Sequence, residues 1–223
     1  MKIKLISVLA IAIIGISTYS CKGEKQNETE ANTAEEVQKA SPEAITYIVD
    51  SASSTIDWIG SKPTGKHNGT INIANGKLKT KDGKIESASF EIDMTSITVT
   101  DLEGEEKAGL EGHLKGEGEG KEDHFFNVAQ HPKASFEVTG IADKEGKNYI
   151  EGNLTIKGIK KNISFPANIS TQGDVVVLNT EIFTINRTDW GVNYASKSVF
   201  EDLGDKFIND DIELKITVKA NKG

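Results

Sequence analysis

Apolar and polar residues alternate along most of the chain after residue 45. The clearest run lies near the end, where every second side chain is apolar: Ile212, Leu214, Ile216 and Val218. Similar runs surround Trp58, Phe90, Phe136, Leu154 and Phe165. A period of two is typical of strands that bury one face and expose the other.

The number and order of these runs predict the architecture. About eight strands follow one another, separated by glycine-containing turns and by no long helical pattern, which favours a closed barrel or a sandwich. Closing the sheet would leave no exposed edge. We therefore predict one all-β domain over residues 45–223. Residues 175–185 are apolar on both faces in places, so we expect one strand there that is covered on both sides.

Residues 101–123 interrupt this rhythm with a long acidic, glycine-rich insertion. Leu110 and Leu114 are four residues apart, which places them on one side of a helix and predicts a short helix around residues 108–114. The alternating Gly and Glu of residues 116–120 predict a loop. Its acidic residues make it unsuited to cradling phosphate.

The first twenty residues predict an export signal. Lys2 and Lys4 precede an apolar run over residues 5–16, which as a helix would span about 18 Å, less than the roughly 30 Å hydrocarbon core of a bilayer. Residues 1–20 therefore indicate a secretory signal peptide. The small Ser20 before Cys21 resembles a bacterial lipobox, which makes Cys21 the predicted lipid attachment site. The alternative is ordinary cleavage that leaves Cys21 a free thiol.

Residues 22–43 contain Val37 as their one large apolar residue. Such a segment buries little surface, so we expect residues 21–44 to be a lipidated cysteine followed by a disordered tether. A weak helix over residues 33–39 is the alternative. The corresponding localisation is an exported lipoprotein, anchored in a membrane by acyl chains and facing the periplasm or the cell exterior.

Composition narrows the function classes. Lys and Arg number 26 against 34 Asp and Glu, and the formal net charge of −8 argues against a nucleic-acid partner. A single cysteine excludes an internal disulfide framework and a cysteine metal cluster. The sequence shows no hydrolase elbow, zincin motif or phosphate-binding loop, and the four histidines have no diagnostic metal spacing. We therefore expect no enzyme activity, no metal and no cofactor.

The chain's one arginine, Arg187, lies two residues before Asp189 on a predicted strand, where the two side chains can share a face and form a pair. This pair would be either structural or part of a ligand-binding mouth.

Four segments together resemble the YceI-like family. They are His-Phe-Phe-Asn-Val-Ala-Gln-His-Pro-Lys-Ala-Ser-Phe-Glu-Val at 124–138, and residues 152–159, 183–191 and 210–216. The resemblance implies an antiparallel eight-stranded lipocalin-like β-barrel, exported to the periplasm, whose apolar lumen binds a polyisoprenoid or similar long amphiphile. His124 stands where the family usually has an acid, and residues 116–121 look inserted, so the lid geometry is expected to differ.

A non-catalytic lipid binder is therefore the leading hypothesis. Its ligand-binding residues would come from the inward aromatic side chains and the lone arginine: Trp58, Phe90, Phe136, Phe165, Phe183, Arg187 and Trp190. Any one of these aromatic residues could instead simply fill the core. Two alternatives remain at this stage, an enzyme that uses His67, His124 or Asp189 at the barrel mouth, and an interaction module that docks a partner on the acidic loop. A homodimer also remains open.

Overall fold

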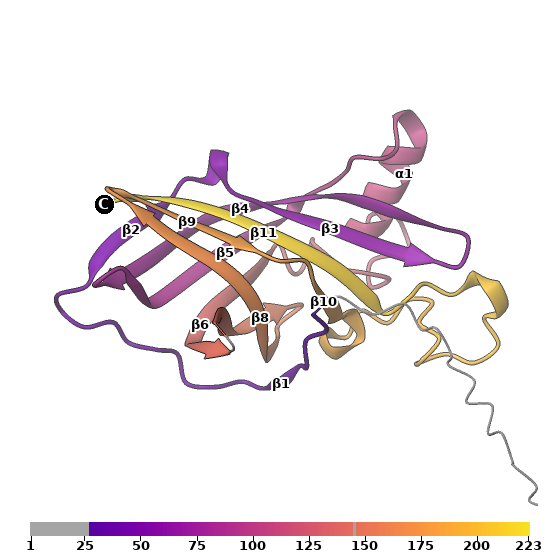
Figure 1. The fold of residues 1–223 in the computed structure, drawn as a ribbon. Helices are drawn as coiled ribbons and strands as arrows, with labels where there is room; N and C mark the ends of the chain where they lie inside the picture. Colours follow the sequence, from indigo (N-terminus) through magenta and orange to yellow (C-terminus); the bar gives the residue numbers. More distant parts are fainter. Residues whose placement is uncertain (1–26, 145) are drawn as a thin grey trace, which may run out of the picture.

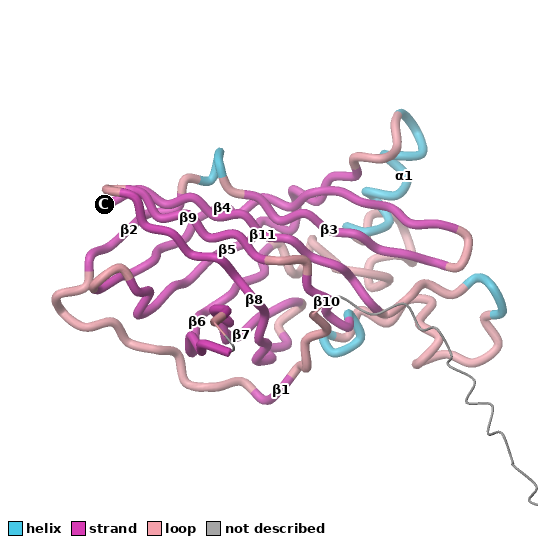
Figure 2. Tube along the Cα trace, viewed as in Figure 1, coloured by secondary structure: helices cyan, strands magenta, loops and turns pink. Residues whose placement is uncertain are grey.

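The computed structural model describes residues 27–144 and 146–223. The predicted signal peptide and Cys21 lie outside the described residues. Figures 1 and 2 show a long, strongly twisted sheet that wraps around itself, with one helix near one end. The elements in chain order are β1 (Asn32–Thr33), β2 (Ile45–Val49), η1 (Ser51–Ser53), β3 (Thr55–Lys62), β4 (Gly65–Lys81), β5 (Lys84–Val99), α1 (Gly104–Lys115), β6 (Lys133–Lys144), β7 (Lys147–Ile156), β8 (Ile159–Gln172), β9 (Val175–Thr180), β10 (Phe183–Asn186), η2 (Arg187–Trp190), η3 (Gly204–Lys206) and β11 (Asp211–Lys222).

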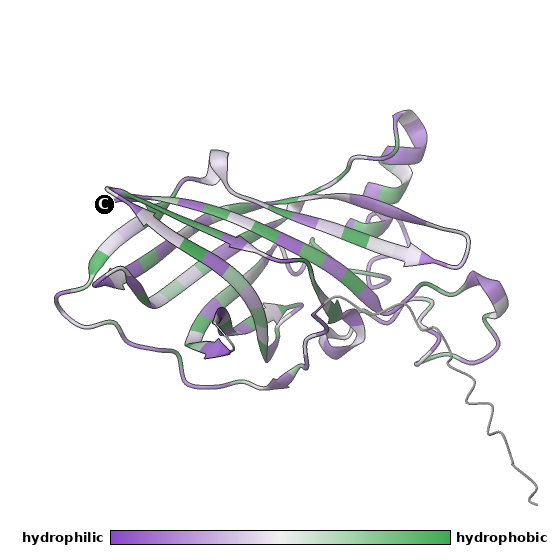
Figure 3. Cartoon of the chain, in the orientation of Figure 1, coloured by the Kyte–Doolittle hydropathy of each residue, from purple (hydrophilic) through white to green (hydrophobic). Residues whose placement is uncertain are grey.

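Eight strands form a closed antiparallel ring. From β3 through β9 each strand pairs with the next along the chain, and β11 completes the ring by pairing with both β9 and β3. The β11–β3 register runs from Ile212 opposite Gly60 to Thr217 opposite Thr55. The predicted all-β, lipocalin-like barrel is therefore confirmed. The alternation that predicted it is visible in Figure 3, where apolar and polar residues follow each other along β3 and β11.

Two stretches of the sheet are each divided into a pair of shorter strands. Both β2 and β3 lie between β4 and β11, separated by the turn at η1. Residues 175–185, expected to be a single strand, form β9 and β10 instead. The burial on both faces has a clear cause in β10: Phe183 and Ile185 line the barrel interior, while Thr29 packs outside and donates from both N and Oγ1 to the Thr184 carbonyl.

The insertion contains the predicted helix, and α1 is longer than the expected residues 108–114. Gly116 ends it in the left-handed conformation (φ 80°), with its N–H directed to the carbonyls of Gly112 and His113. Leu110 and Leu114 pack against the hydrophobic core. None of the helices in the described part of the chain is long and apolar enough to cross a bilayer.

The segment expected to be a disordered tether is ordered over residues 27–44, which we call the N-terminal strap. It runs along the outside of the barrel, where β1 pairs with β8. The side-chain amide of Asn153 accepts from the Glu35 N–H (3.0 Å) and donates to the Glu35 carbonyl (2.7 Å). Further on, Gln38 N donates to the Val138 carbonyl. Hydrogen bonds to backbone groups of the strap thus hold it against the barrel. The strap is ordered although it has few apolar residues to bury.

We expect Asn153→Ala to release the strap. Asn153 is 1% exposed and also accepts a hydrogen bond from Asn162, so its loss leaves buried polar groups unpaired and should cost about 2–3 kcal/mol of unfolding free energy. Amide hydrogen exchange across the strap should rise at the same time. Asn148→Ala, at an exposed position of the same strand, is the control. Unchanged exchange in Asn153→Ala would contradict this role.

Candidate functional site

The barrel encloses an apolar cavity of about 310 Å³, which we call the main cavity. Six of the seven residues proposed for ligand binding line it: Trp58, Phe136, Phe165, Phe183, Arg187 and Trp190. Phe90 does not. It lines a smaller space of about 40 Å³, the distal cavity, deeper in the barrel. The sequence identified Phe90 as inward-facing but could not show which part of the lumen it lines.

Polar residues that line the main cavity gather at one end. Ser61, Lys62 and His67 come from the β3–β4 hairpin, His113 comes from α1, and Asn209 comes from the loop of residues 191–210. Figure 1 shows these three elements at the same end of the molecule, opposite the C-terminus. The main cavity is therefore an apolar lumen with a polar mouth.

Large aromatic rings lie flat against the barrel wall because glycines face them. Trp58 pairs directly with Gly69, and Phe90 pairs with Gly76. A Cβ atom at Gly69 would come within 2.7 Å of the Trp58 ring, and one at Gly152 within 2.2 Å of the Phe136 ring. The rings occupy the space that side chains on those strands would take, which helps to leave the centre of the barrel hollow.

A row of phenylalanines separates the two cavities. Phe165 stacks on Phe183 with ring centres 4.3 Å apart, and the Phe136 ring lies 5.4 Å from Phe165. Phe136 and Phe165 line both the main and the distal cavity. Ile56, Ile92 and Ile216 also line both cavities, so the depth available to an apolar guest depends on these side chains together with the two rings.

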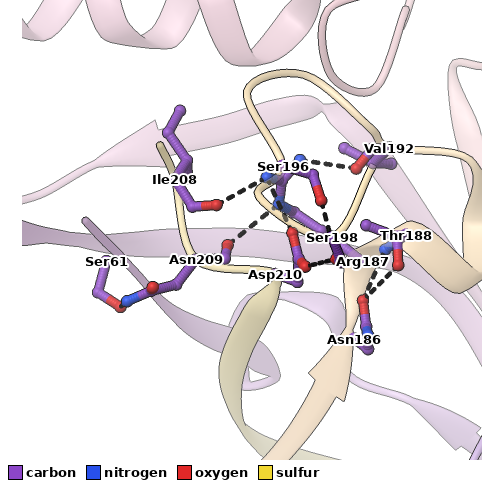
Figure 4. A network of polar contacts seen from close by, with 10 residues as sticks. All are labelled: Ser61, Asn186, Arg187, Thr188, Val192, Ser196, Ser198, Ile208, Asn209 and Asp210. Atoms are coloured by element: carbon purple, nitrogen blue, oxygen red, sulfur yellow. Dashed lines mark hydrogen bonds and ion pairs between the residues drawn. The ribbon is translucent and has the colours of Figure 1, made fainter. Parts of the chain in front are cut away.

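The Arg187 guanidinium holds the protein's own backbone and does not face the mouth as a free ligand-binding group. It donates to the carbonyls of Val192 (2.6 Å), Ile208 (3.1 Å) and Asn209 (3.1 Å), as Figure 4 shows. Its carboxylate partner is Asp210 at 3.4 Å, so the predicted pairing with Asp189 is wrong. Burial lowers the pKa of Arg187, and the charge of Asp210 opposes that shift. These contacts favour a structural role for Arg187 over a role as a ligand-binding group at the mouth.

The two indole N–H groups differ. Trp190, fully buried, donates from Nε1 to the Leu154 carbonyl at 3.1 Å. The buried Nε1 of Trp58 has no hydrogen-bond partner among the described residues. An unpaired buried donor costs on the order of 1–3 kcal/mol.

An aromatic cluster beside the mouth was not foreseen. His113 Nε2 and His124 Nδ1 are 2.9 Å apart, and His124 stacks on Tyr194 with ring centres 4.1 Å apart. Phe125 packs edge-on against His113. These residues come from α1, the segment after it and the loop of residues 191–210, which are too far apart in the sequence for their spacing to reveal the contact.

The histidine pair has an electrostatic consequence. Burial lowers the pKa of His113, and electrostatic repulsion from the neighbouring His124 and Lys121 lowers it further. A neutral pair shares one hydrogen bond between its facing nitrogens. Protonating both rings would instead set two N–H donors against each other.

The arrangement of histidines at the mouth gives little support to the alternative of an enzyme. His67 Nδ1 contacts Asp101 Oδ2 at 2.9 Å, while His124 contacts His113, so these two candidate acid–base residues belong to separate pairs. Within residues 27–144 and 146–223, no group of three His, Cys, Asp or Glu side chains is placed to hold a metal ion.

We expect Gly152→Ala to push the Phe136 ring into the lumen. The new methyl group would clash with the ring and with the Glu137 carbonyl (2.8 Å), and the overpacking should cost about 2–3 kcal/mol. Uptake of the apolar dye N-phenyl-1-naphthylamine should fall together with the melting temperature. Gly109→Ala is the control, because Gly109 lies on an exposed part of α1 away from the cavity lining and a Cβ there meets no atom within 4 Å. Equal dye uptake by the two variants would refute this account of the hollow lumen.

Acidification should destabilise the protein through His113. Its folded-state pKa lies below its ordinary value, so at mildly acidic pH the unfolded chain binds more protons. Stability should therefore fall as the pH drops below about 6.5 and level off below the folded-state value. Thermal melts between about pH 7.5 and about pH 5.5 should show a smaller drop in His113→Gln. His131→Gln, outside the cluster, should keep the full drop; the same drop in both variants would exclude the pair as its cause.

Comparison with known sequences identifies relatives of this chain. A model of the YceI-like domain matches residues 47–220. A UPF0312 protein of Pectobacterium carotovorum is 43% identical over 51 residues, which is 22% of this chain and 26% of that protein. A UPF0312 protein of Shewanella denitrificans is 27% identical over 106 residues, 47% of this chain and 50% of that protein. The chain thus spans between a quarter and half of the length of these relatives.

Solved structures share the fold over a longer span. BcnA of Burkholderia cenocepacia superposes with a TM-score of 0.60 at 21% identity, covering 78% of this chain and 99% of that one. A polyisoprenoid binding domain from Saccharophagus degradans, described as implicated in plant cell wall breakdown, gives a TM-score of 0.56 at 15% identity, with 80% and 99% coverage. At these identities the likeness concerns the fold. Because the family model spans most of the sequence and the barrel agrees with it, this chain belongs to the YceI-like family.

Proposed function

We propose that this chain is a non-catalytic lipid-binding lipoprotein that holds a polyisoprenoid or similar long amphiphile in its lumen. The observation that carries the proposal is the main cavity, which is apolar along its length and polar only at its mouth. An amphiphile has the same division, with a polar head and a hydrocarbon tail. The head would sit among Ser61, His67 and Asn209, and the tail would extend toward Phe136.

The hydrophobic effect is sufficient to hold such a guest. Burying about 400 Å² of hydrocarbon would contribute about 10 kcal/mol before the entropy lost on binding. No metal or charged partner is needed for that contribution. The flat aromatic rings of Trp58 and Phe136 offer a smooth surface to a flexible tail.

The size of the main cavity limits how much of the tail it can hold. At about 310 Å³ it lies at the lower end of the range for ligand pockets. A long polyisoprenoid would need the distal cavity as well, and the two spaces share Phe136 and Phe165. Binding of a long guest would therefore require these rings to move aside.

The neighbouring domain from Saccharophagus degradans, whose description names polyisoprenoid binding, supports this class of guest for a shared fold. We also propose that residues 1–20 are a signal peptide and that Cys21 is acylated. The acyl chains would attach the protein to a membrane, with the barrel facing the periplasm or the cell exterior.

The test places a bulky side chain in the lumen. Ala134 is 4% exposed and lines the main cavity, while the next residue, Ser135, points away from it. Ala134→Phe should lower the affinity for geranylgeraniol, a 20-carbon isoprenoid alcohol, at least tenfold, measured by native mass spectrometry on the delipidated protein. Ser135→Phe adds the same ring outside and should bind as the wild type does. A wild-type protein that binds no geranylgeraniol, or an Ala134→Phe variant that binds it equally well, would rule out the lumen as the site.

A further inference from the structure

Two adjacent large apolar side chains are exposed near the mouth of the barrel. Val199 is 46% exposed and Phe200 is 47% exposed, and both belong to a stretch of six consecutive exposed residues, 197–202. We call Val199 and Phe200 the apolar tip. Paired exposed apolar residues on a projecting loop are unfavourable in water unless something covers them.

The loop that carries the apolar tip is fixed at its base. Arg187 joins the two ends of the loop by donating to Val192 on one side and to Ile208 and Asn209 on the other. Ser196 is fully buried, and Ile208 N donates to the Ala195 carbonyl at 2.9 Å. Figure 4 shows these contacts at the base of the loop, and Figure 1 shows the loop projecting from one end of the barrel. The apolar tip is therefore carried at a defined place.

That place is the rim of the main cavity. Val192, Ile208 and Asn209 line the cavity and belong to the same loop as the tip. An apolar guest that enters the lumen from this end passes the loop. A surface that covers the apolar tip would thus also face the mouth.

The start of the described chain lies on the same half of the barrel. Asn27 Nδ2 donates to the Ile182 carbonyl (2.8 Å), and Thr184 N donates to the Asn27 carbonyl, so the strap begins beside β10. Six residue steps separate Cys21 from Asn27, a reach of about 22 Å at most. A free tether up to residue 45 would have reached about 80 Å. If Cys21 is acylated, as proposed, the bilayer must lie close to this part of the barrel.

The charges around the apolar tip are nearly balanced. The loop carries Lys197 and Lys206 as well as Glu201, Asp202 and Asp205, and the β3–β4 hairpin adds Lys62 and Lys66. Such a surface is neither strongly drawn to anionic headgroups nor strongly repelled by them. Apolar insertion, with neutral headgroups around it, fits this balance.

We propose that the apolar tip of residues 199–200 docks on a lipid bilayer and places the mouth of the main cavity against it. The occupant of this surface is the zwitterionic lipid of the membrane that holds the anchor. The inference relies on the proposed function for the acyl anchor and for the guest that would pass from bilayer to lumen. Docking itself can be measured without a guest in the lumen.

The first experiment measures docking with the mature protein, as extracted from its own membrane, on phosphatidylcholine vesicles with brominated acyl chains that quench nearby tryptophan. Phe200→Trp places a reporter at the tip, and Ile48→Trp places one on β2 at the opposite end, where Ile48 is 42% exposed. Emission from the buried Trp58 and Trp190 is measured in the wild type and subtracted. We expect Phe200→Trp to lose at least half of its reporter emission and Ile48→Trp to keep it. No quenching at Phe200, or equal quenching at both sites, overturns the proposal.

The second experiment measures loading from phosphatidylcholine vesicles that contain geranylgeraniol. Val199→Ser combined with Phe200→Ser should slow the transfer at least fivefold, while the affinity for geranylgeraniol added from ethanol stays within twofold of wild type. Ile45→Ser combined with Ile48→Ser removes similar exposed apolar residues from the far end and should load at the wild-type rate. Equal slowing in both variants, or none at the tip, counts against the proposal. Should the wild type bind no geranylgeraniol at all, the proposed guest fails, and the quenching result still decides the docking.

Discussion

Closure of the sheet by β11 is the constraint on which the lumen depends. This one strand pairs with β3, β9, β10 and β2, so it joins the two ends of the meander and covers both edges along its length. Without it, β3 and β9 would each expose a row of unpaired backbone groups, and the apolar face of the sheet would meet water. The strict alternation in β11, the clearest in the sequence, reflects this position, because its inner residues contribute to the lumen wall from mouth to far end.

Closure alone does not make a barrel hollow, since eight strands enclose a space that side chains can fill. In this barrel, the positions of the glycines help to determine whether the interior is filled or hollow. Gly69, Gly76 and Gly152 lie under the rings of Trp58, Phe90 and Phe136, so each large side chain lies against the wall at a site where its neighbour has none. Trp58 and Phe136 therefore line a cavity of about 310 Å³ instead of filling it, and Phe90 lines the distal cavity.

The sequence predicted those features that depend on local periodicity. Period-two alternation is a property of each strand, so the barrel could be predicted, and the Leu110–Leu114 spacing predicted α1. Features that depend on partners distant in the sequence could not be predicted. Asn153 and Glu35 are 118 residues apart, and nothing in the strap's composition shows that an amide will order it. The nearest acid to Arg187 in the sequence is Asp189, which suggested the wrong pair. In the structure, the loop of residues 191–210 folds back so that its last residue, Asp210, lies beside Arg187.

The short strand β10 explains why several of these features lie together. Its inner side chains, Phe183 and Ile185, form part of the lumen wall, and its outer face receives the start of the strap through Thr184. Directly after it, Arg187 turns away from the strand and fastens the loop of residues 191–210. A continuous strand over residues 175–185 would stay in line with β8, which pairs with β9 as far as Thr180. The break after β9 releases β10 from that register, so that one segment of four residues links the lumen, the strap and the rim of the mouth.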